Sequence, residues 1–160
     1  MQTELKKMIE GASRACDDIF RDSGEILPMW DAETADNRRI LIPVLSGDKD
    51  ITAALIRAKF ELEQVVRYVF ITEAWVLMAK PGTPMATHAL GGGSLEHVPG
   101  RTEEVMFMGE DENGIVMAHR DIIRGKGKPK LGPLRWVPAD SGGFEGRLVG
   151  MLPRGRKTEH

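Results

Sequence analysis

The segment 67–78 constrains the fold most, because it has the residues of a strand whose two faces are both apolar. Tyr68 and Phe70 point to one face, and Val69 and Ile71 point to the other. A strand that is apolar on both faces is covered on both sides. We therefore expect this segment to be a central strand of a sheet that carries packing layers on both faces.

Two other segments have apolar residues at three- and four-residue spacings, which is typical of amphipathic helices. The first spans 3–21, with Thr3 as its expected N-cap and Gly24 after its end. The second spans 49–65. Its predicted buried stripe consists of Ile51, Ala54, Leu55, Ala58, Leu62 and Val65.

The rest of the chain has a period of two with turn residues between the runs, which is typical of β-hairpins. One hairpin joins 25–34 to 38–45, and Pro28 and Pro43 place it near a sheet edge because proline cannot donate to a β-ladder. Further strands are expected at 103–109, 115–123, 134–137 and 144–152. The sequence therefore predicts an α+β fold of order α-β-β-α-β-β-β-β-β. Two helices pack on a mostly antiparallel sheet of about six or seven strands, in two or three hairpins.

A single domain is predicted to span 1–153, followed by a polar tail at 154–160. A chain of 160 residues is a usual size for one domain. Roughly 70% of the surface of such a chain is buried on folding. The segment 80–101 is rich in glycine and proline and has no period, so we expect it to be a long irregular loop.

The cysteine content and the apolar runs indicate the compartment. The single cysteine, Cys16, excludes an intrachain disulfide, which favours a reducing compartment and a cytoplasmic location. Residues 1–20 mix acids and bases, unlike a signal or transit peptide. Every apolar run is far shorter than the roughly 20 residues that span a bilayer, so we expect no membrane insertion.

The net charge of −2 is unevenly distributed along the chain. Residues 1–119 hold 20 acids and 12 bases, whereas residues 120–160 hold 4 acids and 10 bases. Such asymmetry is found where the basic part binds an anionic partner, or where the two parts lie against each other in the fold. We favour the second explanation.

Several sequence motifs that mark enzymes and nucleotide-binding proteins are absent. The chain has no GxxxxGK[ST] phosphate-binding loop and no GxGxxG that opens a helix. It also lacks the HExxH, CxxC and GxSxG signatures. We therefore expect no nucleotide site of these types and no cofactor.

Glu73 and His119 are the candidate catalytic residues. Glu73 interrupts an apolar face between Ile71 and Trp75, where an unpaired carboxylate costs several kcal/mol. His119, on its own strand, needs a carboxylate partner such as Glu73 or Asp121 to act as a base or a ligand. One hypothesis is thus a small hydrolase- or isomerase-type enzyme with Glu73 and His119 beneath the 80–101 loop. The alternatives for Glu73 are a structural ion pair with Arg57, Arg67 or Arg120, or a strand end exposed to solvent. The alternative for His119 is a packing role.

Two other groups have the donor types of metal or acid–base sites, and we interpret both as solvated surface. His88, Glu96 and His97 lie in the predicted loop without a standard zinc spacing. Asp31 and Glu33 are two residues apart on the first hairpin, as polar residues of a half-exposed edge strand are. No metal site is therefore predicted.

The basic segment 120–135 is the candidate anion or nucleic-acid contact. Lysines between glycines in an exposed loop neutralise phosphates, and a nearby tryptophan stacks on bases. Against this, the isoelectric point is about 6.1 and no RNA- or DNA-binding motif is present. The residues concerned are Arg124, Lys126, Lys128, Lys130 and Trp136, with Arg120 and Arg135 beside them.

The sequence alone does not determine a function. Our leading hypothesis is a binding or assembly module that acts through protein contacts, as a homo-oligomer, because two hairpins offer strand edges for pairing. The enzyme and the nucleic-acid-associated protein remain the alternatives.

Overall fold

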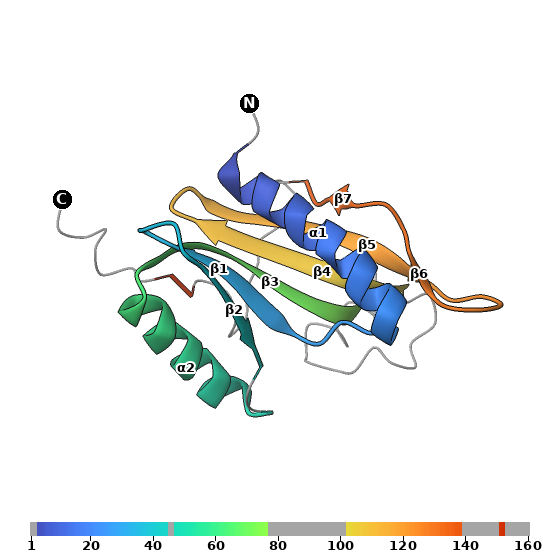
Figure 1. Ribbon diagram of the computed structural model, residues 1–160, viewed down its shortest axis with the longest axis horizontal. Coiled ribbons are helices and arrows are strands. Elements are labelled where there is room, and N and C mark those ends of the chain that lie inside the picture. Colours follow the sequence, from blue (N-terminus) through green and yellow to red (C-terminus); the bar gives the residue numbers. More distant parts are fainter. Residues whose placement is uncertain (1–2, 45–46, 77–101, 139–150, 153–160) are drawn as a thin grey trace, which may run out of the picture.

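The computed structural model describes residues 3–44, 47–76, 102–138 and 151–152. Within these ranges the chain forms two helices and seven strands (Figure 1). They are α1 (Glu4–Ser23), β1 (Met29–Thr34), β2 (Arg39–Pro43), α2 (Lys49–Leu62), β3 (Val65–Val76), β4 (Thr102–Asp111), β5 (Gly114–Ile123), β6 (Lys130–Leu131) and β7 (Arg135–Trp136). Their order confirms the predicted α+β fold.

The strands pair antiparallel in the order β2-β1-β3-β4-β5-β6, and β7 also pairs with β5. β2 is an edge of the sheet, as the prolines of the first hairpin predict. The β4–β5 hairpin is less available for pairing than we expected from the sequence. β4 is internal, and the short strands β6 and β7 cover part of the β5 edge.

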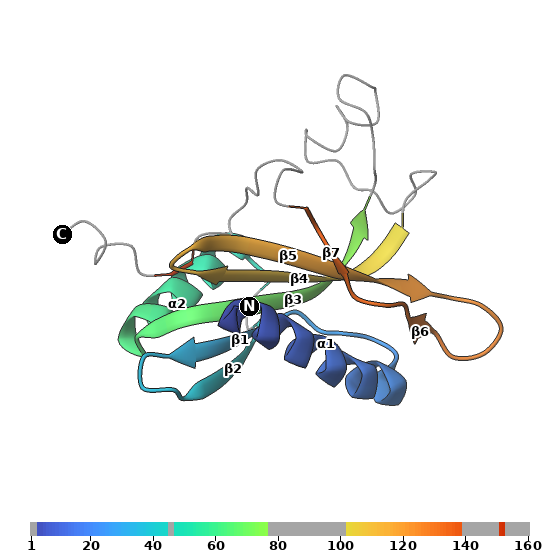
Figure 2. The same cartoon turned by 90° about the horizontal axis from the view of Figure 1, so that it is seen from above.

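The two helices lie on opposite faces of the sheet, and β3 is buried by both (Figure 2). Val69 and Ile71 pack in the core beneath α1. Tyr68 and Phe70 pack in the core beneath α2. The prediction of a central strand with two covered faces is therefore confirmed.

α1 begins and ends where its capping residues predict. The Thr3 hydroxyl accepts a hydrogen bond from the Lys6 amide at 3.2 Å, and Gly24 closes the helix in the left-handed region at φ 76°. One apolar face packs on β3, β4 and β5. Its buried residues are Leu5, Met8, Ile9, Ala12, Ser13, Cys16 and Phe20.

The buried face of α2 differs from our prediction. Asp48 caps the helix. The helix begins at Lys49 as expected, but it ends at Leu62, and its core residues are Thr52, Ala53, Ile56 and Phe60. Of the predicted buried stripe, only Val65 is buried, and it belongs to β3. The other five residues, Ile51, Ala54, Leu55, Ala58 and Leu62, are exposed.

The reason is that α2 is apolar on two faces. Positions 53, 56 and 60 have helical spacing just as positions 51, 55 and 58 do, so periodicity alone does not select one face. Phe60 decides between them because it has the largest apolar surface to bury. Its ring lies 5.0 Å from the ring of Tyr68, beside the Trp30–Phe70 stack.

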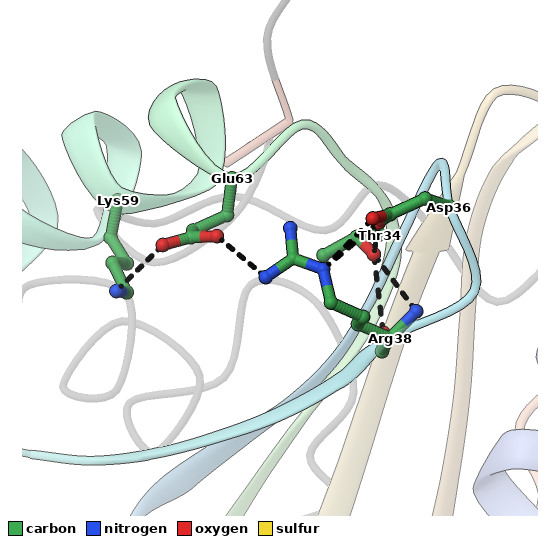
Figure 3. A network of polar contacts seen from close by, with 5 residues as sticks. All are labelled: Thr34, Asp36, Arg38, Lys59 and Glu63. Atoms are coloured by element: carbon green, nitrogen blue, oxygen red, sulfur yellow. Dashed lines mark hydrogen bonds and ion pairs between the residues drawn. The ribbon is translucent and has the colours of Figure 1, made fainter.

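A polar network joins the β1–β2 turn to the C-terminal end of α2 (Figure 3). The Arg38 guanidinium pairs with Asp36 at 3.0 Å and with Glu63 at 3.1 Å. Glu63 also pairs with Lys59 at 3.1 Å, and the buried Thr34 hydroxyl donates to Asp36. Of these contacts, the Arg38–Glu63 pair links the end of the helix to the edge hairpin.

Three predictions concern residues outside the described ranges. They are the irregular loop at 80–101, nearly all of the strand at 144–152, and the tail at 154–160. In the described part, β7 corresponds to the strand predicted at 134–137, whereas the two-residue β6 lies where we expected a loop to end.

Candidate interaction surface and carboxylate–histidine cluster

Glu73 holds the connection between α1 and β1. Its carboxylate accepts a hydrogen bond of 2.6 Å from the backbone N–H of Ile26, and it lies opposite Val105 in the β3–β4 register. Val105 and Ile26 both belong to the core beneath α1, so Glu73 projects from that face of the sheet. This contact is a hydrogen bond to the backbone and not one of the ion pairs that the sequence left open for this residue.

His119 projects from the opposite face. Its strand neighbours Ala118 and Arg120 point toward α1, where Ala118 is in the core and Arg120 bonds to Ser13. Alternation along β5 therefore turns His119 away from α1. The structure does not bring Glu73 and His119 together, so they form no common acid–base pair.

A cluster of three side chains surrounds the His119 imidazole instead. The Nδ1 atom of His119 lies 3.3 Å from Glu104 Oε2 and 3.9 Å from Asp121 Oδ1. Glu104 and Asp121 face each other directly in the β4–β5 register. One potential ligand atom from each residue lies within 4.8 Å of those of the other two. The cluster has the donor types of a divalent-metal or proton-transfer site.

The Glu104 carboxylate is nine-tenths buried, with 9% of its side chain exposed. Burial raises the pKa of this carboxyl above its ordinary value, and nearby Asp121 raises it further. His119 and a hydrogen bond from Thr102 oppose that rise in pKa. Two carboxylates so close together are mutually unfavourable unless a proton or a cation lies between them.

Sequence reasoning missed Glu104. The alternation along β5 places His119 and Asp121 on the same face of the strand. This alternation is enough to predict that Asp121 is a partner of His119. Glu104 joins them only through the register of β4 against β5, which depends on the tight turn at Glu112 and Asn113. Counting back along the strands from that turn pairs residue 104 with residue 121, whereas the turn that the sequence predicts at Asn113 and Gly114 would pair residue 104 with residue 123.

Some of the residues predicted to contact an anion interact with other side chains of the protein, and others have no acidic partner in the described chain. Arg124 forms an ion pair with Glu103, and Trp136 lies under the Lys6 ammonium, 5.4 Å from the ring centroid. Within the described ranges, Lys126, Lys128 and Lys130 have no acidic partner within ion-pair distance. Together with Arg21 and Asp17 they line a hollow of about 410 Å³ against the C-terminal part of α1.

The prediction that the acidic pair on the first hairpin is solvated surface of an edge strand is wrong, because β1 lies between β2 and β3 and both carboxylates are paired. Asp31 forms an ion pair with Arg39, and Glu33 forms one with Arg67 on β3. These are neighbouring strands, so each pair stabilises a strand contact. His88, Glu96 and His97, by contrast, lie outside the described residues.

A larger cleft of about 690 Å³ opens where the β1–β2 and β4–β5 turns approach the start of α1. It is lined by turn residues such as Asn37 and Gln64, both at positive φ, and by Asp111 and Glu112. Its described lining contains neither histidine nor cysteine. The cleft thus offers fewer potential catalytic or metal-binding groups than the cluster around His119.

The outward face of α2 carries a stripe of exposed apolar side chains. Ile51 and Leu55 are each 53% exposed and Leu62 is 77% exposed. Ala54 and Ala58 lie between them and are also exposed. A monomeric protein rarely leaves such a contiguous stripe in water.

Comparison of the chain with protein families, with curated proteins and with solved structures found no match. Among the described helices, neither is both long enough and apolar enough to cross a membrane.

Proposed function

We propose that this protein is an assembly module that self-associates through the outward face of α2. The observation that carries the proposal is the exposed stripe of Ile51, Leu55 and Leu62 on a helix whose other face is already packed in the core. Burial of this stripe against a partner is favourable by roughly 25 cal/mol for each Å² of apolar surface removed from water.

The spacing of the stripe favours a helix as the partner. Ile51, Leu55, Ala58 and Leu62 are separated by four, three and four residues. This is the spacing of a helix–helix seam, in which side chains of one helix insert between those of the other. Ala54 and Ala58 are small, so a second helix can approach closely at the middle of the seam.

A second copy of the chain is the simplest such partner. A two-fold dimer uses the same patch on both subunits, and the α2 stripe is complementary to itself in an antiparallel arrangement. That arrangement also places the positive end of each helix dipole beside the negative end of the other. A helix of 14 residues is only about 21 Å long, so we expect a small interface and a weak dimer.

The test is sedimentation velocity of the full chain over a wide range of concentration. The wild type is expected to shift from monomer to dimer as concentration rises. A Leu55→Lys and Leu62→Lys double variant is expected to remain monomeric, because two charges cannot be buried in the seam. Leu41→Lys is the matched control: Leu41 is a leucine with 65% exposure on β2, outside α2, and its replacement is expected to leave the dimer intact.

Crosslinking tests the geometry independently. In a Cys16→Ala background, Ala58→Cys lies near the middle of the stripe and is expected to form a disulfide between two copies under mild oxidation. A wild type that stays monomeric at every concentration contradicts the proposal. A dimer broken by Leu41→Lys but not by the α2 variant assigns the interface to the β2 edge instead.

A second candidate function, anion or nucleic-acid binding, is supported by Lys126, Lys128 and Lys130. They are exposed, have no acidic partner in the described chain, and share a hollow with Arg21. If this hypothesis holds, a fluorescent single-stranded oligonucleotide is expected to bind the protein at low ionic strength. Its affinity is expected to fall steeply as the salt concentration rises. Replacement of the three lysines by glutamine is expected to abolish that binding. Equal binding by the wild type and the triple variant contradicts it.

An acid–base enzyme built on Glu73 and His119 is not part of the proposal. The two side chains leave opposite faces of the sheet, so no single substrate group contacts both.

A further inference from the structure

We propose that Glu104, His119 and Asp121 bind a divalent first-row transition-metal ion on the face of the sheet opposite α1. This site is independent of the α2 interface in the proposed function. It lies across β4 and β5, and its three donors come from two neighbouring strands.

The donor set has the composition of a transition-metal site. One imidazole nitrogen and two carboxylates suit Zn²⁺, Mn²⁺, Fe²⁺ or Co²⁺, whereas Mg²⁺ and Ca²⁺ are bound by oxygen donors. Three protein donors leave at least one position for water or a substrate oxygen, as in catalytic rather than closed structural zinc sites.

The distances suit coordination better than hydrogen bonding. His119 Nδ1 is shut off from solvent and has no hydrogen-bond partner in the described chain, although Glu104 Oε2 is 3.3 Å away. The two atoms are thus within ion-pair distance without the alignment of a hydrogen bond. Two ligands of one tetrahedral zinc ion, each about 2.1 Å from the metal, lie about 3.4 Å apart. Asp121, at 3.9 Å from Nδ1, needs to move closer by a few tenths of an ångström.

The surroundings keep these donors in place. Thr102 donates a hydrogen bond to the other Glu104 oxygen at 3.2 Å, which orients the carboxylate toward His119. Among the described residues, Arg135 lies near the carboxylates, with 4.0 Å between its guanidinium and Asp121 Oδ2. Its side chain is 60% exposed, so it can move into solvent when a metal ion binds.

A metal ion resolves the charge problem of the cluster. Glu104 and Asp121 repel each other as anions, and Glu104 is too buried for water to screen that repulsion. A divalent cation neutralises both carboxylates at once.

The direct test titrates the full-length, metal-free chain with Co²⁺ and records the visible absorption bands. One equivalent is expected to bind saturably, with bands that Zn²⁺ displaces. His119→Ala and Glu104→Gln are each expected to weaken binding by on the order of 100-fold, since each removes a ligand. Arg135→Ala is expected to tighten it several-fold by removing a nearby positive charge.

The control variant is His88→Ala combined with His97→Ala, which removes the two histidines of the 80–101 segment and is expected to leave Co²⁺ affinity unchanged. If the variants of the cluster fold poorly, a measurement on the wild type alone still tests the proposal. Substoichiometric Mn²⁺ is expected to broaden the NMR signals of the His119 ring before those of the other histidines. Absence of saturable 1:1 binding, or loss of binding only in the His88 and His97 variant, overturns the proposal.

Discussion

Gly109 on β4 lies directly beneath Leu5 on α1, so closely that the pair sets the distance between the helix and the sheet. A Cβ atom at Gly109 would lie 2.8 Å from Leu5 Cδ1 and 3.0 Å from Ile9 Cδ1. Leu5 is 1% exposed and Ile9 is fully buried, so neither side chain has free space to enter. The absence of a side chain at position 109 thus allows α1 to approach the sheet.

Gly109→Ala is therefore expected to destabilise the protein by about 1–3 kcal/mol through overpacking. Leu5→Ala alone is expected to cost about 2–5 kcal/mol because it leaves a cavity. Since the new methyl group enters that cavity, the double variant is expected to lose less stability than the sum of the losses in the two single variants. Urea denaturation of the four proteins in this cycle measures the coupling. Strict additivity would mean that α1 shifts away from β4 rather than packing on it.

Arg120 ties β5 to α1 from within the core. Its guanidinium donates to the Ser13 carbonyl at 2.9 Å and the Gly132 carbonyl at 2.6 Å, and pairs with Asp17 at 2.8 Å. Arg120→Met is expected to destabilise the fold by about 2–4 kcal/mol, because buried partners lose their donor. Arg124→Met, which breaks the exposed pair with Glu103, is expected to cost less than about 1 kcal/mol. Equal losses of stability for both variants in urea denaturation would contradict this ranking.

Truncation of a side chain is expected to reduce stability strongly on the buried face of α2 and very little on its exposed face. Phe60 is fully buried, so Phe60→Ala is expected to cost about 3–5 kcal/mol. Leu62 is 77% exposed, and Leu62→Ala is expected to change the stability of the monomer by no more than about 0.5 kcal/mol. Unfolding at low protein concentration isolates the monomer. A large loss at Leu62 there would mean that the stripe is covered within one chain.

Most of the fold followed from local patterns that admit one interpretation. α1 has a single apolar face between a good N-cap and a left-handed glycine, so its extent and buried face were both predictable. The central position of β3 followed from its two apolar faces in the same way. The edge position of β2 followed from proline, which acts through the missing N–H regardless of the tertiary fold.

The failures share a different cause, because each depended on contacts between distant segments. Two apolar faces compete on α2, and only the space above Trp30 and Tyr68 selects the face with Phe60. Glu104 enters the cluster through strand register, which periodicity does not contain. The explanation that we favoured for the charge asymmetry stays a prediction, although one contact of that kind is present between Arg120 and Asp17.

Cys16 provides a test of how dry the core beneath α1 is. Burial raises the pKa of this thiol from 9.0 to about 11, with Arg120 lowering the pKa and Asp17 raising it. The folded state therefore keeps the neutral thiol while the unfolded chain ionises. The stability linked to this group is fully present below pH 9 and is lost as the pH rises toward 11. Cys16→Ala lacks this linkage, so the wild type is expected to lose about 2 kcal/mol relative to that variant between pH 8.5 and pH 11. Denaturation curves of both proteins across this range measure the difference directly. Parallel curves would mean that the thiol reaches water in the folded state, and rapid alkylation of Cys16 at pH 8 would then accompany them.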